Sequence, residues 1–197
     1  KIDPTPSTQL ALQSIYLNDH RDTWIRKAVL CSLKVDEIEF TRNMANKVSP
    51  IYLEELFEIS ARRLKNEIDL KNLISITLNK EWANDDKVKL LNALRTGITR
   101  SKNFESLNPV NIRTLIEDES NLNLEISMEL HQLSKTIGAV PFLSKSSVER
   151  IIKQLPKGDG TNTNLIKQYV RFIADINQSS IVRDKLIQII MSASNEE

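Results

Sequence analysis

Four polar and charged residues follow one another at Asp19-His20-Arg21-Asp22, and these residue types can bind a metal ion or move a proton. A helical metal site usually pairs two histidines one turn apart, but the other histidine of the chain is His131. We therefore expect the segment to be a solvated turn between helices rather than a metal or catalytic site.

A second candidate is the loop Gly158-Asp159-Gly160-Thr161-Asn162, which combines glycines with oxygen ligands. It lacks the full calcium-loop pattern and the Gly-Lys-Ser/Thr of a phosphate loop, so a plain surface turn is favoured. No Ser-His-Asp or Cys-His pair lies in a context that suggests a nucleophile. We predict no catalytic, cofactor-binding or metal-binding residue, no cofactor, and no enzyme activity.

Large aromatic residues and one thiol remain as candidates for contacts. Trp24 and Trp82 are big enough to anchor a partner, but the neighbours of Trp24 favour core packing, whereas Trp82 precedes a helix and is expected to be exposed. Together with Lys89, Trp82 forms the candidate interaction surface. The single cysteine, Cys31, cannot form an internal disulfide and is expected to be mostly buried.

Charge and composition narrow the function classes. Lys plus Arg number 27 and Asp plus Glu 26, a net charge of +1 that gives no general attraction to phosphate backbones. No apolar run approaches the roughly 20 residues of a membrane span. We expect protein partners or neighbouring domains of the same polypeptide, no nucleic acid, no membrane insertion, and a monomer.

Helix signals recur along the chain, and only 4 Gly and 6 Pro interrupt them. Ser49-Pro50 and Asn108-Pro109 each place a capping residue before proline, and Gly138 suits the position after a helix end. The segment that begins at Asp69 is rich enough in branched residues to pass for a strand, but its helical neighbours favour a helix. The predicted helices cover residues 7–18, 22–33, 36–48, 49–65, 69–78, 84–98, 108–116, 122–137, 147–155, 165–176 and 180–192.

The helix that begins at Asp22 carries the clearest pattern. Asp22 is expected to cap the first turn, with Arg26 one turn on in the favourable acid-first order. The predicted apolar stripe consists of Trp24, Ile25, Ala28, Val29 and Leu33. We expect Asp22 and Arg26 to act as a cap and a tie between successive helices.

These observations predict an all-α fold of tandem antiparallel helix pairs, a HEAT/armadillo-like right-handed α-α superhelix in a single domain over 1–197. One helix pair cannot bury both of its faces, whereas stacked pairs share a continuous core. Unit lengths near 40 residues are typical of such repeats.

Asp22 to Leu33 resembles the second helix of a HEAT-type repeat, with Asp22, Trp24 and Arg26 as the repeat motif. Together with Ser7 to Leu12, Tyr52 to Leu56 and Lys89 to Arg95, it resembles the HEAT-like segment of large bacterial multidomain proteins. In those proteins such a segment lies between a sugar-dehydrogenase-like propeller and a cytochrome c-type domain. The resemblance is strongest over 1–103.

The resemblance implies a non-catalytic scaffold or spacer within a larger exported protein, periplasmic or secreted. The start at Lys1 without Met fits a segment of a longer protein or a processed product. One cysteine excludes the Cys-x-x-Cys-His haem motif from this chain. Two alternatives remain open, an intracellular HEAT/armadillo-type adaptor and a nucleic-acid-binding HEAT-like domain.

Overall fold

The computed structural model describes residues 5–33, 37–101 and 122–138, with the single residues Phe172, Asp184 and Ile187. Within these residues every regular element is a helix and none is a strand, which confirms the all-α prediction for this part of the chain. None of the described helices is long and apolar enough to cross a membrane.

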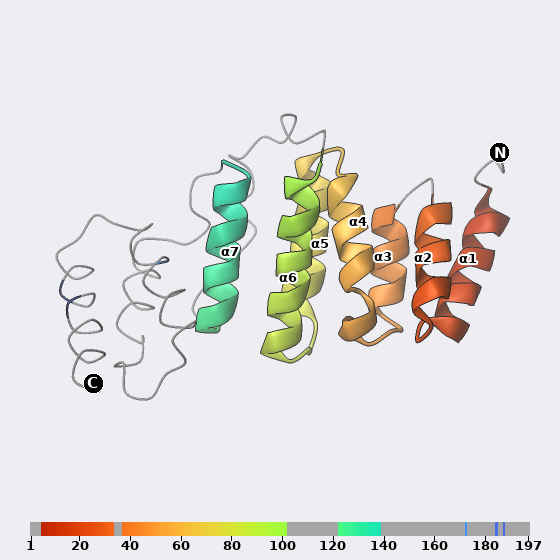
Figure 1. Ribbon diagram of the computed structural model, residues 1–197, viewed down its shortest axis with the longest axis horizontal. Coiled ribbons are helices and arrows are strands. Elements are labelled where there is room, and N and C mark those ends of the chain that lie inside the picture. The colour runs from red at the N-terminus through yellow and green to blue at the C-terminus, as the bar shows by residue number, and fades with distance from the viewer. Residues whose placement is uncertain are drawn as a thin grey trace. The chain divides into compact units, whose positions relative to one another are not determined.

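The helices come in the order that Figure 1 shows. Their bounds are α1 Pro6–Asp19, α2 Thr23–Ser32, α3 Glu37–Ala45, the 3-10 turn η1 Pro50–Tyr52, α4 Glu54–Arg62, α5 Glu67–Asn79, α6 Asn84–Thr99 and α7 Leu124–Thr136. The remaining predicted helices, 108–116, 147–155, 165–176 and 180–192, and the 158–162 loop lie outside the described ranges.

Two compact units divide the chain. Lys1–Glu117 and Glu125–Phe142 form the first, and Asp118–Leu124 and Leu143–Glu197 form the second. Helices α1 to α6 and nearly all of α7 belong to the first unit, whose described residues carry all of the geometry below.

Side-chain caps fix where several helices begin. The Thr5 hydroxyl accepts a hydrogen bond from the Thr8 amide before α1, and the Asn66 side chain accepts one from the Asp69 amide before α5. At the end of α7, Gly138 adopts a φ of 68°, which confirms its predicted place after the helix. The helix expected from Asp69 is confirmed as a helix, and it begins slightly earlier, at Glu67.

The prediction of one helix from Ser49 to Lys65 is wrong in detail. Pro50 opens the 3-10 turn η1, and the Leu53 amide bonds to the Pro50 carbonyl before α4 begins at Glu54. Ser49 makes no side-chain cap, so nothing there holds the first turn in α geometry. Helix α4 ends at Arg62, earlier than predicted, and the amides of Arg63 and Leu64 bond three residues back, to the carbonyls of Ser60 and Ala61.

The chain reverses direction at each connection from α1 to α6 (Figure 1). Consecutive helices pack against each other in the pairs α1 with α2, α3 with α4, and α5 with α6. Contacts also skip one helix, since α3 packs against both α1 and α5, and α4 packs extensively against α6. Helices α3, α4 and α5 therefore each pack against a neighbour in sequence and against a helix two elements away.

The core between these helices is aliphatic and aromatic. Buried side chains come from every helix of the first unit, and the largest fully buried ones include Tyr16, Phe40, Phe57, Leu33, Met44, Leu53, Leu56, Leu70, Leu73 and Ile74. Burial of such side chains contributes roughly 1.5–3 kcal/mol each, which makes this packing the main stabilising term.

A polar cluster that is buried at Thr41 and Ser60 and partly exposed at Arg63 joins α3 to α4. The Thr41 hydroxyl donates to the Glu37 carbonyl at 2.6 Å and lies 2.7 Å from the Ser60 hydroxyl. Arg63 Nη1 donates to the Glu37 carboxylate at 2.5 Å and to the Leu33 carbonyl at 2.7 Å. These bonds satisfy groups that burial would otherwise penalise, and they fix the end of α2 against α3 and α4.

Helices α4 and α6 approach each other most closely at Gly97. A Cβ atom added there would overlap the Glu58 carbonyl oxygen and would lie 2.7 Å from Ala61 Cβ. Gly97 is helical and buried, so what this position requires is the absence of a side chain rather than an unusual backbone conformation.

We expect Gly97→Ala to destabilise the protein by about 1–3 kcal/mol, because the new methyl group meets backbone that cannot yield. The same change at an open helix position would stabilise it by about 1 kcal/mol through helix propensity. Urea unfolding followed by circular dichroism measures the difference. Ser14→Ala, at an exposed position of α1, is the matched control, and equal stability of the Gly97→Ala and wild-type proteins would contradict the packing constraint.

Candidate interaction surface

The amino-terminal end of α2 is built by its cap. Asp22 Oδ1 accepts hydrogen bonds from the Trp24 amide at 2.7 Å and the Ile25 amide at 3.2 Å. The carboxylate thus satisfies two of the free N–H groups of the first turn and meets its positive partial charge. The predicted cap is confirmed.

Arg26 does not pair with that carboxylate but reaches across to α4. Its Nε donates to Glu55 Oε2 at 3.1 Å, and its Nη1 donates to the His20 carbonyl at 2.7 Å. The side chain of Arg26 is only 13% exposed and that of Glu55 is 37% exposed, so the ion pair is partly shielded from solvent. Arg26 therefore links the α1–α2 turn, α2 and α4.

One aromatic ring packs against this arginine, and others extend the network. Its guanidinium carbon lies 5.6 Å from the centre of the Tyr52 ring, and the His20 ring packs edge-on against the same ring at 4.9 Å. The Tyr16 hydroxyl donates to the Tyr52 carbonyl at 2.5 Å, and its ring meets Phe40 edge-on at 5.7 Å. The network joins α1, α2, α3 and η1.

Within the Asp19–Asp22 segment, the side chains of His20 and Asp22 are used to build this turn. His20 Nδ1 lies 2.9 Å from the Leu17 carbonyl, and the Asp22 carboxylate is held by the helix amides. Among the described residues no group of three or more histidine, cysteine, aspartate and glutamate side chains is arranged to hold a metal ion. The geometry is that of a structural corner.

Trp24 is not a core residue, which corrects the sequence prediction. It is 80% exposed, and Lys27 Nζ lies 5.6 Å from the centre of its ring. The buried face of α2 is formed by Val29, Leu30 and Leu33, with Arg26 on the same stripe. Trp24 is about 200° around the helix from Arg26, so turning Arg26 inward turns the indole outward.

The same rotation overturns two further expectations for α2. Cys31, predicted to be mostly buried, is exposed, and Ala28 from the predicted stripe is exposed as well. Trp24, Ala28 and Cys31 are spaced at four and three residues, so they share one helix face. The described part of the molecule thus presents an apolar strip on α2 that sequence reasoning placed in the core.

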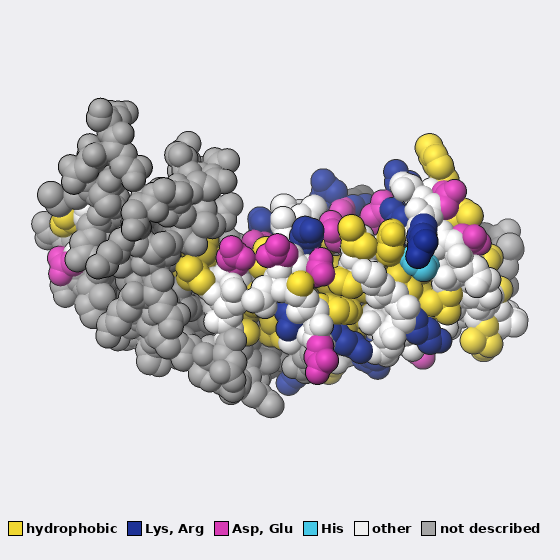
Figure 2. Space-filling view, turned by 90° about the horizontal axis from the view of Figure 1, so that it is seen from below, with side chains coloured by type: hydrophobic (Ala, Val, Ile, Leu, Met, Phe, Trp, Pro, Cys, Tyr) yellow, Lys and Arg dark blue, Asp and Glu magenta, His cyan; other side chains and the backbone are white. Residues whose placement is uncertain are grey.

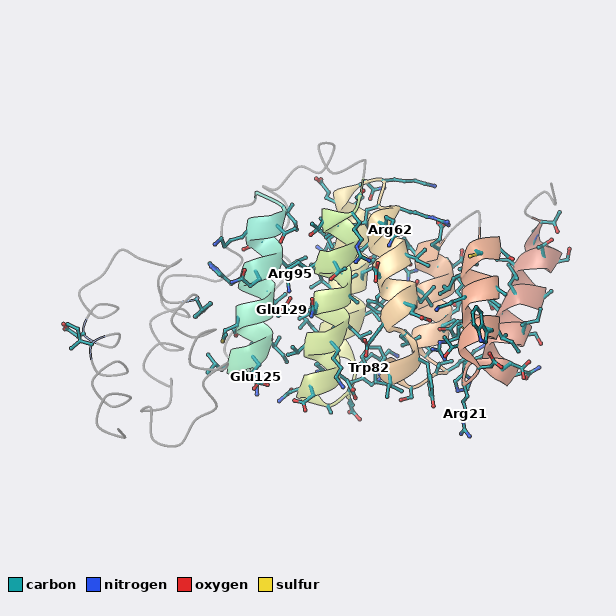
Figure 3. The ribbon with its side chains drawn as sticks, viewed as in Figure 1. Arg21, Arg62, Trp82, Arg95, Glu125 and Glu129 are labelled. Atoms are coloured by element: carbon teal, nitrogen blue, oxygen red, sulfur yellow. The ribbon has the colours of Figure 1, made fainter. Side chains whose placement is uncertain are left out.

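The two residues predicted to form an interaction surface lie elsewhere, at α6. Trp82 is half-buried in the connection before this helix, contrary to the expectation of exposure, and Lys89 is exposed one turn into it. Figure 3 labels Trp82 near the lower end of α6 and Arg21 near the lower end of α2. Trp24 and Trp82 therefore belong to different helix pairs.

Ion pairs between α4, α6 and α7 are features that the sequence did not reveal. Glu58 Oε1 accepts from Arg62, one turn further along the same helix, at 2.6 Å, and it also accepts from Arg100 at 2.6 Å. Arg95 of α6 donates to Glu129 of α7 at 2.6 Å. The cross-helix partners are 42 and 34 residues apart, so local spacing gave no signal.

Charges of both signs are interspersed on the face that Figure 2 shows, with apolar side chains between them. The described part of this face therefore carries no stripe of Lys and Arg alone, which a nucleic-acid-binding surface would typically show.

Comparison with known proteins gives no relative. No family model, no curated protein sequence and no solved structure matches this chain.

Burial raises the pKa of the Tyr16 phenol well above its ordinary value of about 10, while the Arg26 charge lowers it and the Glu55 charge raises it. A raised pKa means that the folded state favours the neutral phenol, so its stabilising effect is present below about pH 10 and is lost at higher pH.

We expect Tyr16→Phe to cost about 1 kcal/mol near neutral pH, because the Tyr52 carbonyl loses its donor. The free energy of unfolding in urea should then fall less between about pH 8 and about pH 11 in the variant than in the wild type. Lysine titration is common to both proteins and cancels in the comparison. Equal pH dependence would show that Tyr16 is not linked to folding.

Proposed function

We propose that this chain is a non-catalytic helical-repeat scaffold that makes protein–protein or interdomain contacts. The observation that carries the proposal is the alternating packing, in which α1, α3 and α5 contact in order while α4 packs on α6. A stack of antiparallel pairs produces this pattern, because each pair must cover the open face of the next.

Ties between alternate helices support the same architecture. Arg26 joins α2 to α4, and Glu58 joins α4 to α6 through Arg100. A third pair, Arg95 with Glu129, continues from α6 to α7. A right-handed HEAT-like superhelix would place α2, α4 and α6 in one layer, where pairs of this kind hold successive repeats in register.

The contact function is supported by what the stack exposes. Trp24 is 80% exposed on a short, well-capped helix, and aromatic anchors carry a large share of binding energy at protein interfaces. In the Asp19–Asp22 corner, the side chains of His20 and Asp22 are engaged in structural bonds. An exported bacterial parent rests on the sequence resemblance alone and is part of the proposal on that footing.

The repeat architecture predicts that stability is local. Leu30→Ala in α2 should lower the local stability of the α1–α2 pair by about 2–5 kcal/mol, because it removes a buried side chain. Native-state hydrogen exchange should show that α1 and α2 amides lose protection while α6 amides keep most of theirs. The reciprocal variant, Leu94→Ala in α6, should give the opposite pattern. Uniform loss in both variants would indicate one cooperative bundle and would contradict the repeat proposal.

The scaffold function is tested by photocrosslinking the full chain in cells that naturally produce it. A photoreactive phenylalanine analogue is placed at Trp24 or Lys89, with Lys71, exposed on α5, as the control position. We expect light-dependent adducts to a protein, or to another part of the same polypeptide, several-fold above the Lys71 background. Adducts at neither position above that background would argue against a contact role for these surfaces.

A further inference from the structure

Two arginines from different helices converge on one carboxylate oxygen. Arg62 lies in the last turn of α4, and Arg100 caps the end of α6. Both donate to Glu58 Oε1 at 2.6 Å. Figure 3 labels Arg62 where its side chain lies beside α4 and α6. The close approach of these helices at Gly97 brings the two guanidinium groups together.

The charges of this group do not cancel. Two guanidinium groups and one carboxylate leave a net charge of +1, and the other ion-paired carboxylates of the described region are used by Arg26, Arg63 and Arg95. Each guanidinium has five N–H donors in a planar fork, and Glu58 takes one from each.

Both arginines also remain open to a ligand. The Arg62 side chain is 44% exposed and the Arg100 side chain is 60% exposed, whereas Glu58 beneath them is 25% exposed. The carboxylate therefore lies deeper than the two cations that it positions. A second anion can approach the guanidinium groups from the solvent side.

From this geometry we propose that the Arg62–Arg100 pair binds an acidic side chain of a partner protein. Glu58 already demonstrates that the pair accepts a carboxylate, and a net charge of +1 matches one further carboxylate rather than a phosphate dianion. A nucleic acid or an anionic membrane is typically bound by more basic residues than these two. The inference rests on the proposed scaffold function and names the chemistry of its partner.

The test measures fluorescence anisotropy of a short labelled glutamate-rich peptide titrated with the full chain. Arg62→Gln together with Arg100→Gln should weaken binding about tenfold, the loss expected when about 1.4 kcal/mol of charge-assisted bonding is removed. Arg42→Gln, a change at an exposed arginine of α3, is the control and should leave affinity unchanged.

The direction in which Glu58→Gln changes the peptide affinity is the decisive result. The glutamine oxygen can still accept from both arginines, but the site gains one unit of positive charge, so the peptide should bind several-fold more tightly. A purely structural role for Glu58 predicts no such gain. Circular dichroism of each variant verifies that it is folded.

Three results would overturn the inference. The first is that the paired Arg62/Arg100 change and Arg42→Gln alter the affinity for the glutamate peptide equally. The second is that Glu58→Gln does not increase this affinity. The third is that a phosphoserine peptide or an oligonucleotide binds more tightly than the glutamate peptide. If photocrosslinking gives protein adducts at Trp24 or Lys89 but the arginine changes do not alter peptide binding, the scaffold function is retained and this site is rejected. Glutamate-peptide binding without any protein adduct in cells would reject the scaffold function instead.

Discussion

The contact between α4 and α6 at Gly97 is the constraint on which much of the rest depends. With no side chain at this position, the Glu58 backbone carbonyl and Ala61 can lie directly against α6. That approach brings Arg100, three residues further along α6, within reach of the Glu58 carboxylate. Helices α3 and α5 then pack against this pair and against each other. One glycine thus sets both the spacing of the core and the position of a charged group on the surface.

Polar contacts add directionality to this apolar packing. Hydrophobic burial stabilises the stack, but it does so with little preference for how far one helix slides along another. The Glu37–Arg63 pair, the Thr41–Ser60 contact and the Arg26–Glu55 pair each require a particular register. A shifted register would leave these groups without partners in a partly buried setting, and unpaired polar groups there destabilise the fold. These polar contacts therefore affect the register of the helices more than the free energy of unfolding.

Local signals predicted most of the helices and several of their ends. Asp22 and Gly138 act through neighbouring backbone, so their roles follow from residue type and position alone. The orientation of α2 followed only in part, because the predicted stripe merged two narrower stripes, an exposed one through Trp24 and Ala28 and a buried one through Val29 and Leu33. The buried stripe is the one that carries Arg26, whose ion-pair partner Glu55 lies 29 residues away in sequence. The second partner of Glu58 lies 42 residues away and was beyond any local rule.

The place where sequence reasoning failed is itself informative. On α2 the cation is turned inward and the largest apolar side chain is turned outward, which reverses the usual preference of both residue types. The inward arginine is accounted for by its bonds to Glu55, the His20 carbonyl and the Tyr52 ring. The outward indole has no such account within the described part of the chain beyond the Lys27 contact. Departures from local rules without a structural gain are expected at functional sites, and the exposed indole therefore supports the contact role proposed for α2.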